Sequence, residues 1–144
     1  MNVINYKIVG ERTGVPRSTI NSAKDVHAFC IEHLYDGDIL VSESAYLLLL
    51  NRANVIVGTA KISQGGVTSC EIDTKIVCKY VVQNIASGVI VVHNHPSGNL
   101  RTSPQDDNCC KKLQAAIDFF NARLLDFVIV TDEGYLSYAD EGKI

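Results

Sequence analysis

Residues 93–106 read His93-Asn94-His95-Pro96-Ser97-Gly98-Asn99-Leu100-Arg101-Thr102-Ser103-Pro104-Gln105-Asp106. They follow the apolar run 89–92, which has the length and composition of a buried strand. Side chains two positions apart on a strand point to the same side. We therefore expect His93 and His95 to converge on one point at the end of this strand, with Asn94 facing away.

A carboxylate from the next element completes a set of three metal ligands. Asp106 lies in the first turn of a helix that is expected to begin near Pro104. Zinc sites with three protein ligands keep a fourth position open for water and are typically catalytic. A structural interpretation is equally available, because residues 103–106 form a capping box with Ser103 at the N-cap. The two interpretations are compatible, since a cap can hold a ligand-bearing turn in place.

Length and composition indicate one globular domain with a single core. The chain has 144 residues, of which 47% are hydrophobic. No apolar run approaches the roughly 18 residues that cross a bilayer, and the N-terminus lacks a secretory pattern. We therefore expect a cytoplasmic protein without a membrane anchor. The five cysteines form no CxxC pair, which argues against a disulfide framework or a thiolate cluster. A net charge of −3 without clustered Lys and Arg argues against direct binding of nucleic acid.

Strand and helix signals alternate along the chain, which predicts an α/β layered fold. Strands are expected at residues 45–50, 55–62, 89–92, 124–130 and 135–138, and helices at 22–34, 74–86 and 104–121. The hairpins at 51–54 and 131–134 make part of the mixed sheet antiparallel. The helix at 74–86 should be capped by Asp73, bury Ile85 and end at Gly88.

The spacing of the histidine stretch resembles the motif of JAB/MPN+ (JAMM) domains. That motif is His-x-His, then seven residues, then Ser-x-x-Asp, and residues 93–106 match it. The string His93-Asn94-His95-Pro96-Ser97-Gly98 is similar to the RadC branch, and the similarity extends from Ser42 to Ile144. It includes Leu50-Asn51-Arg52-Ala53-Asn54, Ile62-Ser63-Gln64-Gly65-Gly66 and Leu125-Asp126. The resemblance implies the JAB/MPN fold, a mixed sheet flanked by helices that is similar to cytidine-deaminase folds.

The resemblance also implies a zinc-dependent hydrolase of the metallopeptidase type, which cleaves a peptide or isopeptide bond with metal-activated water. One Zn²⁺ per chain would be held by His93, His95 and Asp106. The implied catalytic base is Glu43, eight residues ahead of Asn51 as in the family. The residues alone do not favour Glu43 over Glu71 or Asp73. By the same resemblance, Ser103 would hydrogen-bond the oxyanion of a tetrahedral intermediate.

The domain boundaries follow from the same comparison of segments. Residues 1–41 would form an N-terminal arm and a short helix packed on the domain, and 42–144 the RadC-like JAB/MPN domain. Full-length relatives usually carry an N-terminal helix-hairpin-helix domain, for which this chain is too short, so a short form is expected. Phe127 stands where relatives often have histidine, and we expect it to lie outside the metal site. The identity of the peptide or isopeptide substrate and any homo-oligomer stay open.

Other functions are less well supported by the sequence. A nucleobase deaminase needs H-x-E and P-C-x-x-C, and neither pattern occurs. The letters His-Asn-His also suggest a nuclease, but those nucleases spread their ligands over a ββα unit. The non-enzymatic alternative is a DNA-repair-associated or scaffolding module with a non-catalytic metal site. Structural zinc sites are usually closed by four protein ligands, whereas this motif supplies three.

Overall fold

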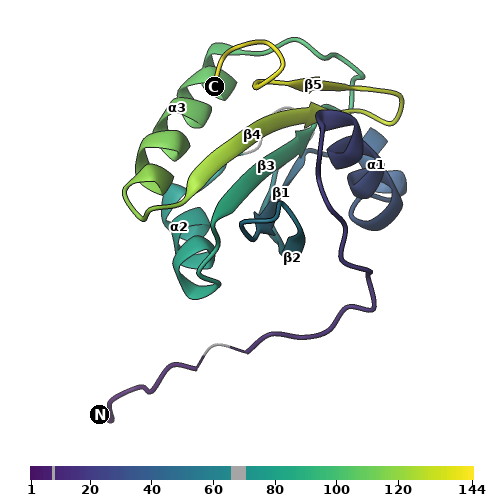
Figure 1. The fold of residues 1–144 in the computed structure, drawn as a ribbon. Coiled ribbons are helices and arrows are strands. Elements are labelled where there is room, and N and C mark those ends of the chain that lie inside the picture. Colours follow the sequence, from purple (N-terminus) through teal and green to yellow (C-terminus); the bar gives the residue numbers. More distant parts are fainter. Residues whose placement is uncertain (8, 66–70) are drawn as a thin grey trace.

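A five-stranded mixed sheet forms the centre of the fold, in the order β2-β1-β3-β4-β5 (Figure 1). The computed structural model describes residues 1–7, 9–65 and 71–144, so Gly66 of the family-like segment 62–66 lies outside the described residues. The strands are β1 (Ser44–Leu50), β2 (Ile56–Gln64), β3 (Gly88–Asn94), β4 (Arg123–Val130) and β5 (Tyr135–Ser137). Strands β3 and β4 pair in parallel, and the other neighbours pair antiparallel. The expected α/β fold is confirmed.

Helices cover both faces of this sheet (Figure 1). The helices are α1 (Ala23–His33), α2 (Thr74–Gln83) and α3 (Pro104–Asp118), with a 3-10 turn η1 (Gly37–Leu40). Helices α2 and α3 share one apolar cluster with alternate residues of the sheet, such as Leu47 and Val91. Helix α1 and η1 share the other cluster with the intervening residues, such as Leu48 and Val92. The apolar run of β1 therefore divides its side chains between two cores, as expected for a strand covered on both faces.

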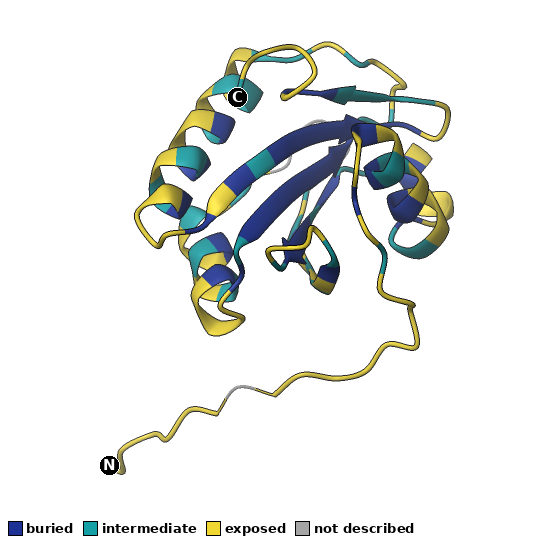
Figure 2. Ribbon diagram, viewed as in Figure 1, coloured by how far each residue is buried: buried dark blue, intermediate teal, exposed yellow. Residues whose placement is uncertain are grey.

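Strand β3 lies at the centre of these layers, and all seven of its residues are buried (Figure 2). Its neighbours are β1, with Ala45 opposite His93, and β4, with Val130 opposite Asn94. The strand therefore presents His93 and Asn94 to opposite faces of the sheet at its C-terminal end.

The segment that precedes α1 lies largely outside the three layers. Its residues 1–7 and 9–17 are exposed and extend away from the sheet in Figure 1. The segment joins the domain through an antiparallel bridge between Thr19 and Val55. Among the described residues, no helix has both the length and the apolarity that crossing a membrane requires.

Helix α2 ends earlier than the sequence pattern predicts. The N–H of Ile85 donates to the carbonyl of Val82 at 3.3 Å, and that of Ala86 to Val81 at 3.1 Å, which is a Schellman motif. Ile85 occupies its left-handed position with φ 49° and is 88% exposed, so its expected burial is wrong. Gly88 does not cap the helix but opens β3, where an added Cβ would lie 2.5 Å from the Leu125 side chain.

The left-handed isoleucine should cost stability that glycine would restore. A left-handed L-residue costs about 1–2 kcal/mol, and the exposed Ile85 side chain loses little packing on removal. We expect Ile85→Gly to raise the free energy of unfolding by about 1 kcal/mol, measured by urea denaturation. Val82→Gly, within α2, should lower it by about 0.5 kcal/mol. Equal losses for both variants would contradict this account of the helix end.

Candidate metal centre

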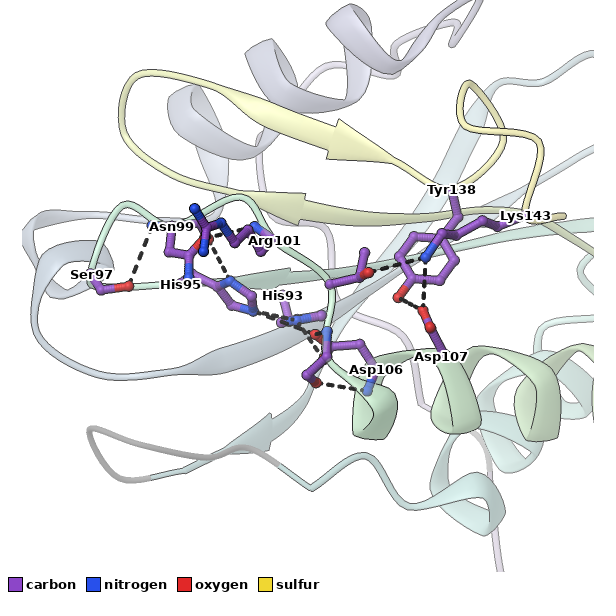
Figure 3. Close-up of polar contacts among 11 residues, drawn as sticks. His93, His95, Ser97, Asn99, Arg101, Asp106, Asp107, Tyr138 and Lys143 are labelled. Atoms are coloured by element: carbon purple, nitrogen blue, oxygen red, sulfur yellow. Dashed lines mark hydrogen bonds and ion pairs between the residues drawn. The ribbon is translucent and has the colours of Figure 1, made fainter.

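The two histidines and the aspartate of the sequence motif lie together at the C-terminal end of β3 (Figure 3). His93 Nε2 lies 3.1 Å from His95 Nε2 and 3.2 Å from Asp106 Oδ1. His95 Nε2 lies 3.8 Å from Asp106 Oδ2. Within residues 1–7, 9–65 and 71–144, these three side chains form the group whose donor atoms could hold a metal ion.

The separations of these donor atoms fit a small divalent ion. With metal–ligand bonds of about 2.0–2.1 Å, a tetrahedral zinc site places neighbouring ligand atoms about 3.3 Å apart. The three measured separations, 3.1, 3.2 and 3.8 Å, scatter around this value. Two imidazoles and one carboxylate are also ligands that zinc and other first-row transition metals accept. The residues present therefore fit a metal ion with little rearrangement.

Hydrogen bonds outside the cluster orient His95 so that its Nε2 could serve as a metal ligand. Its Nδ1 lies 2.6 Å from the carbonyl oxygen of Asn99, which can only accept, so Nδ1 carries the proton and Nε2 keeps its lone pair. The main-chain N–H of His95 donates to Val130 at 3.0 Å on β4. In the loop between His95 and Asn99, the chain turns at Gly98, which has φ 78°. Second-shell bonds of this kind fix the tautomer and orientation of a metal-binding histidine.

Packing holds His93 in addition to the contacts that its Nε2 makes with His95 and Asp106. The residue is 4% exposed, and its Nδ1 has no hydrogen-bonding partner among the residues that the structure describes. The ring of Phe127 packs edge-on against His93 at a centroid distance of 5.2 Å and also contacts the ring of Tyr138, at 5.0 Å. Phe127 has no atom that could ligate a metal, yet it lies in direct contact with the cluster and lines the cavity in front of it.

Ser103 and Asp106 are joined by two reciprocal hydrogen bonds at the start of α3. Ser103 Oγ accepts from the Asp106 N–H at 3.1 Å, and Asp106 Oδ2 accepts from the Ser103 N–H at 3.0 Å, as the capping box predicts. Burial raises the pKa of Asp106, but the hydrogen bond and charge of His93 and the bonds from Ser103 outweigh it and bring the pKa to about 2. Asp106 is therefore an ionised, oriented carboxylate at neutral pH.

A second polar cluster fixes the next residue of α3 (Figure 3). The hydroxyl of Tyr138 donates to Asp107 Oδ1 at 2.6 Å, and Lys143 Nζ donates to the same oxygen at 3.2 Å and to Thr102 at 3.0 Å. These bonds lower the pKa of Asp107. They tie the C-terminal segment to the first turn of α3, which carries Asp106. Nothing in the local sequence pattern indicated this contact.

A cavity of about 1100 Å³ opens over the three donor residues. Glu43 and Ser103 line it, and so do Glu71 and Asp73, the carboxylates that the sequence could not separate from Glu43. Asp73 is engaged as the N-cap of α2, accepting from the Lys75 N–H at 2.8 Å. Glu71 is exposed, whereas Glu43 is half-buried.

One wall of this cavity was missed by the sequence analysis. It is formed by a face of α3 that is polar apart from one cysteine, namely Gln105, Asn108, Cys109 and Lys112. Their spacing of three, four and seven residues is that of one helix face. Tracing this stripe forward from the Asp106 turn would have identified these residues from sequence.

The sequence of this chain is similar to those of known proteins. A family model described as "RadC-like JAB domain" matches residues 20–143, starting before the Ser42 at which the motif segments begin. A UPF0758 protein of Flavobacterium johnsoniae is 37% identical over 123 residues, 85% of this chain and 52% of that protein. One of Porphyromonas gingivalis is 38% identical over 106 residues, 73% and 47% of the two chains. The chain spans about half the length of the relatives it matches.

Metal titration tests the cluster directly. We expect the wild-type protein to bind one divalent transition-metal ion per chain and to gain thermal stability from it. His95→Ala should lower the affinity about 100-fold or more, because even loss of an outer-shell partner costs 10–100-fold. Isothermal titration with Zn²⁺, Co²⁺ and Mg²⁺ measures the stoichiometry and the affinity, and thermal denaturation with and without each ion measures the gain in stability.

Asp107→Asn is the matched control for this titration. It alters the neighbouring carboxylate, which bonds Tyr138 and Lys143, and should leave the affinity within a few-fold of wild type. Equal, negligible binding by wild type and His95→Ala would mean that the cluster is not a metal site.

Proposed function

Because this chain belongs to the RadC-like JAB domain family, we propose that it is a zinc-dependent hydrolase of the metallopeptidase type. The observation that carries the proposal is the convergence of three donor side chains that line a large cavity. Within the described part of the chain, this group offers three ligands and not the four that close a structural zinc site. The bond cleaved would be an amide bond of a peptide or an isopeptide.

The proposed division of labour assigns each polar group one task. His93, His95 and Asp106 would hold the ion, and their net charge of −1 would leave the site cationic. When bound, Zn²⁺ supplies Lewis acidity and lowers the pKa of water toward neutrality. Glu43 would accept the proton of the attacking water and deliver it to the leaving nitrogen, because cleavage of an amide requires that nitrogen to be protonated.

Ser103 would stabilise the developing oxyanion as a hydrogen-bond donor. Its oxygen already accepts from the Asp106 N–H, but a hydroxyl has one donor in addition to two acceptor sites. The cap therefore leaves the O–H to serve another acceptor, and Ser103 lines the cavity next to the ligand Asp106. A donor in this position would act on the same carbonyl that the ion polarises.

Two features of the surroundings support Glu43 over the other acidic residues of the cavity. The carboxylate of Asp73 accepts a hydrogen bond at the start of α2. If Asp73 acted as a base, this helix cap would be lost. Glu71 is exposed to solvent, whereas Glu43 is half-buried beside the first residue of β1. A partly buried carboxylate is held in a narrower range of positions than an exposed one.

The role of Glu43 can be separated from metal binding by substitution. We expect Glu43→Gln to bind Zn²⁺ with unchanged affinity and to lower kcat by about 10²–10⁴-fold, the usual contribution of a general base. Glu71→Gln, on the exposed side of the same cavity, should lower kcat less than about threefold under the same assignment. The assay uses zinc-loaded protein with a library of internally quenched peptides and Lys-linked isopeptides.

Each of the following outcomes would refute a different part of the proposal. If Glu43→Gln also loses zinc, Glu43 is a ligand and the division of labour is wrong. If Glu71→Gln abolishes turnover and Glu43→Gln does not, the base is misassigned. If zinc-loaded wild type cleaves no member of either library, the amide hydrolase is refuted in favour of a non-catalytic metal site.

A further inference from the structure

Asn94 lies between the two histidines and is completely buried, with 0% of its surface exposed. Its side chain makes three hydrogen bonds to main-chain groups of one segment. Oδ1 accepts from the Ser44 N–H at 2.8 Å, and Nδ2 donates to the carbonyls of Ile39 and Ser42, both at 2.9 Å. The carboxamide thereby uses its two donors and its acceptor on the chain that leads into β1.

These bonds bracket Glu43 on both sides. Ser42 and Ser44 are the neighbours of Glu43 in sequence. The Asn94 side chain therefore hydrogen-bonds the main chain immediately before and after Glu43. Two further bonds act on the same residues. The Gly65 N–H donates to the Glu43 carbonyl at 2.9 Å, and the Tyr35 hydroxyl donates to the Ser44 carbonyl at 2.8 Å. Hydrogen bonds from three residues, Asn94, Gly65 and Tyr35, therefore fix the main chain at and beside Glu43.

Asn94 reaches this segment because the main-chain ladder ends before it. The last residue pair between β1 and β3 is Ala45 with His93. One position further, the Asn94 carboxamide takes the place of main-chain pairing and binds the Ser44 N–H. Few other side chains could replace it here, because aspartate lacks the two donors, aliphatic side chains lack all three groups, and glutamine is one carbon longer.

We propose that Asn94 is the positioning residue that fixes Glu43 relative to the metal ligands. Strand alternation turns His93 toward the cavity and Asn94 toward the opposite face, so one tripeptide would supply two of the three metal ligands and also holds the segment that bears Glu43. The inference rests on the proposed function for the task of Glu43. The placement of Glu43 by Asn94 is a separate statement that can be measured without a substrate.

The experiment measures where the Glu43 carboxylate lies with respect to the ion. In protein with ¹³C-labelled glutamate, the resonance of Glu43, assigned by Glu43→Gln, is compared between the Co²⁺-loaded and Zn²⁺-loaded forms. The difference is a paramagnetic shift that depends steeply on the distance and direction from Co²⁺. The variants are Asn94→Ala, which removes all three bonds, and Asn94→Asp, which keeps the shape and the acceptor but removes both donors.

Asn51→Ala is the matched control. Asn51 also holds main chain through its side-chain oxygen, accepting from Ala53 at 2.9 Å and Val55 at 3.1 Å, but it lies at the opposite end of β1. Its loss should reduce thermal stability without changing the Glu43 shift. Asn94→Asp serves as the deciding variant if Asn94→Ala does not fold.

We expect both Asn94 variants to bind one Co²⁺ and to show a Glu43 shift that is severalfold smaller than in wild type. On any substrate cleaved by wild type, kcat should fall about tenfold or more with KM nearly unchanged, as expected when a general base is displaced. Combining Asn94→Asp with Glu43→Gln should lower kcat no further than Glu43→Gln alone, because coupled residues are not additive.

An unchanged Glu43 shift in both variants, or equal loss of the shift in Asn51→Ala, would overturn the positioning role. These results are distinct from failure of the proposed function. A wild-type Glu43 without any paramagnetic shift, or a wild-type protein that binds no Co²⁺, would refute the assignment of the base or the metal site itself.

Discussion

The structure depends on one constraint, the burial of strand β3 on both of its faces. Its seven residues are buried between β1 and β4 in the sheet and between two apolar clusters above and below it. A slip by one residue would move every side chain to the other face, and the side chains packed in one cluster would then have to fit the other. Register is therefore fixed at the C-terminal end as well, where His93 turns toward the cavity and Asn94 toward η1.

Each donor residue of the candidate metal centre is held by a different interaction. His93 is packed against Phe127, His95 is oriented by the carbonyl of Asn99, and Asp106 is fixed by the capping box with Ser103. None of these interactions needs the ion. Contacts within the chain thus hold all three side chains, and such contacts reduce the reorganisation that metal binding would otherwise require.

Much of the candidate site could be predicted from local sequence because its three potential ligands lie within one strand, one loop and one helix turn. The spacing of His93, His95 and Asp106 reflects strand alternation followed by a helix start, and both are short-range rules. The sequence-based prediction was less accurate where the apolar character of a residue did not match its environment in the fold. Ile85 has the apolar character of a buried helix residue, yet it occupies a left-handed, exposed position, because the buried Ala86 and Val81 determine how the chain turns into β3.

The sequence by itself determined the ligand types, their spacing and the cap that orients Asp106, because each depends on residues close together in the chain. Only the tertiary structure decided which residues surround Glu43. The bond between Ser44 and Asn94 joins positions 50 residues apart, and it exists because β1 pairs with β3 in a single register. No local pattern could specify that contact, since it follows from the order of strands in the sheet and from the burial of β3.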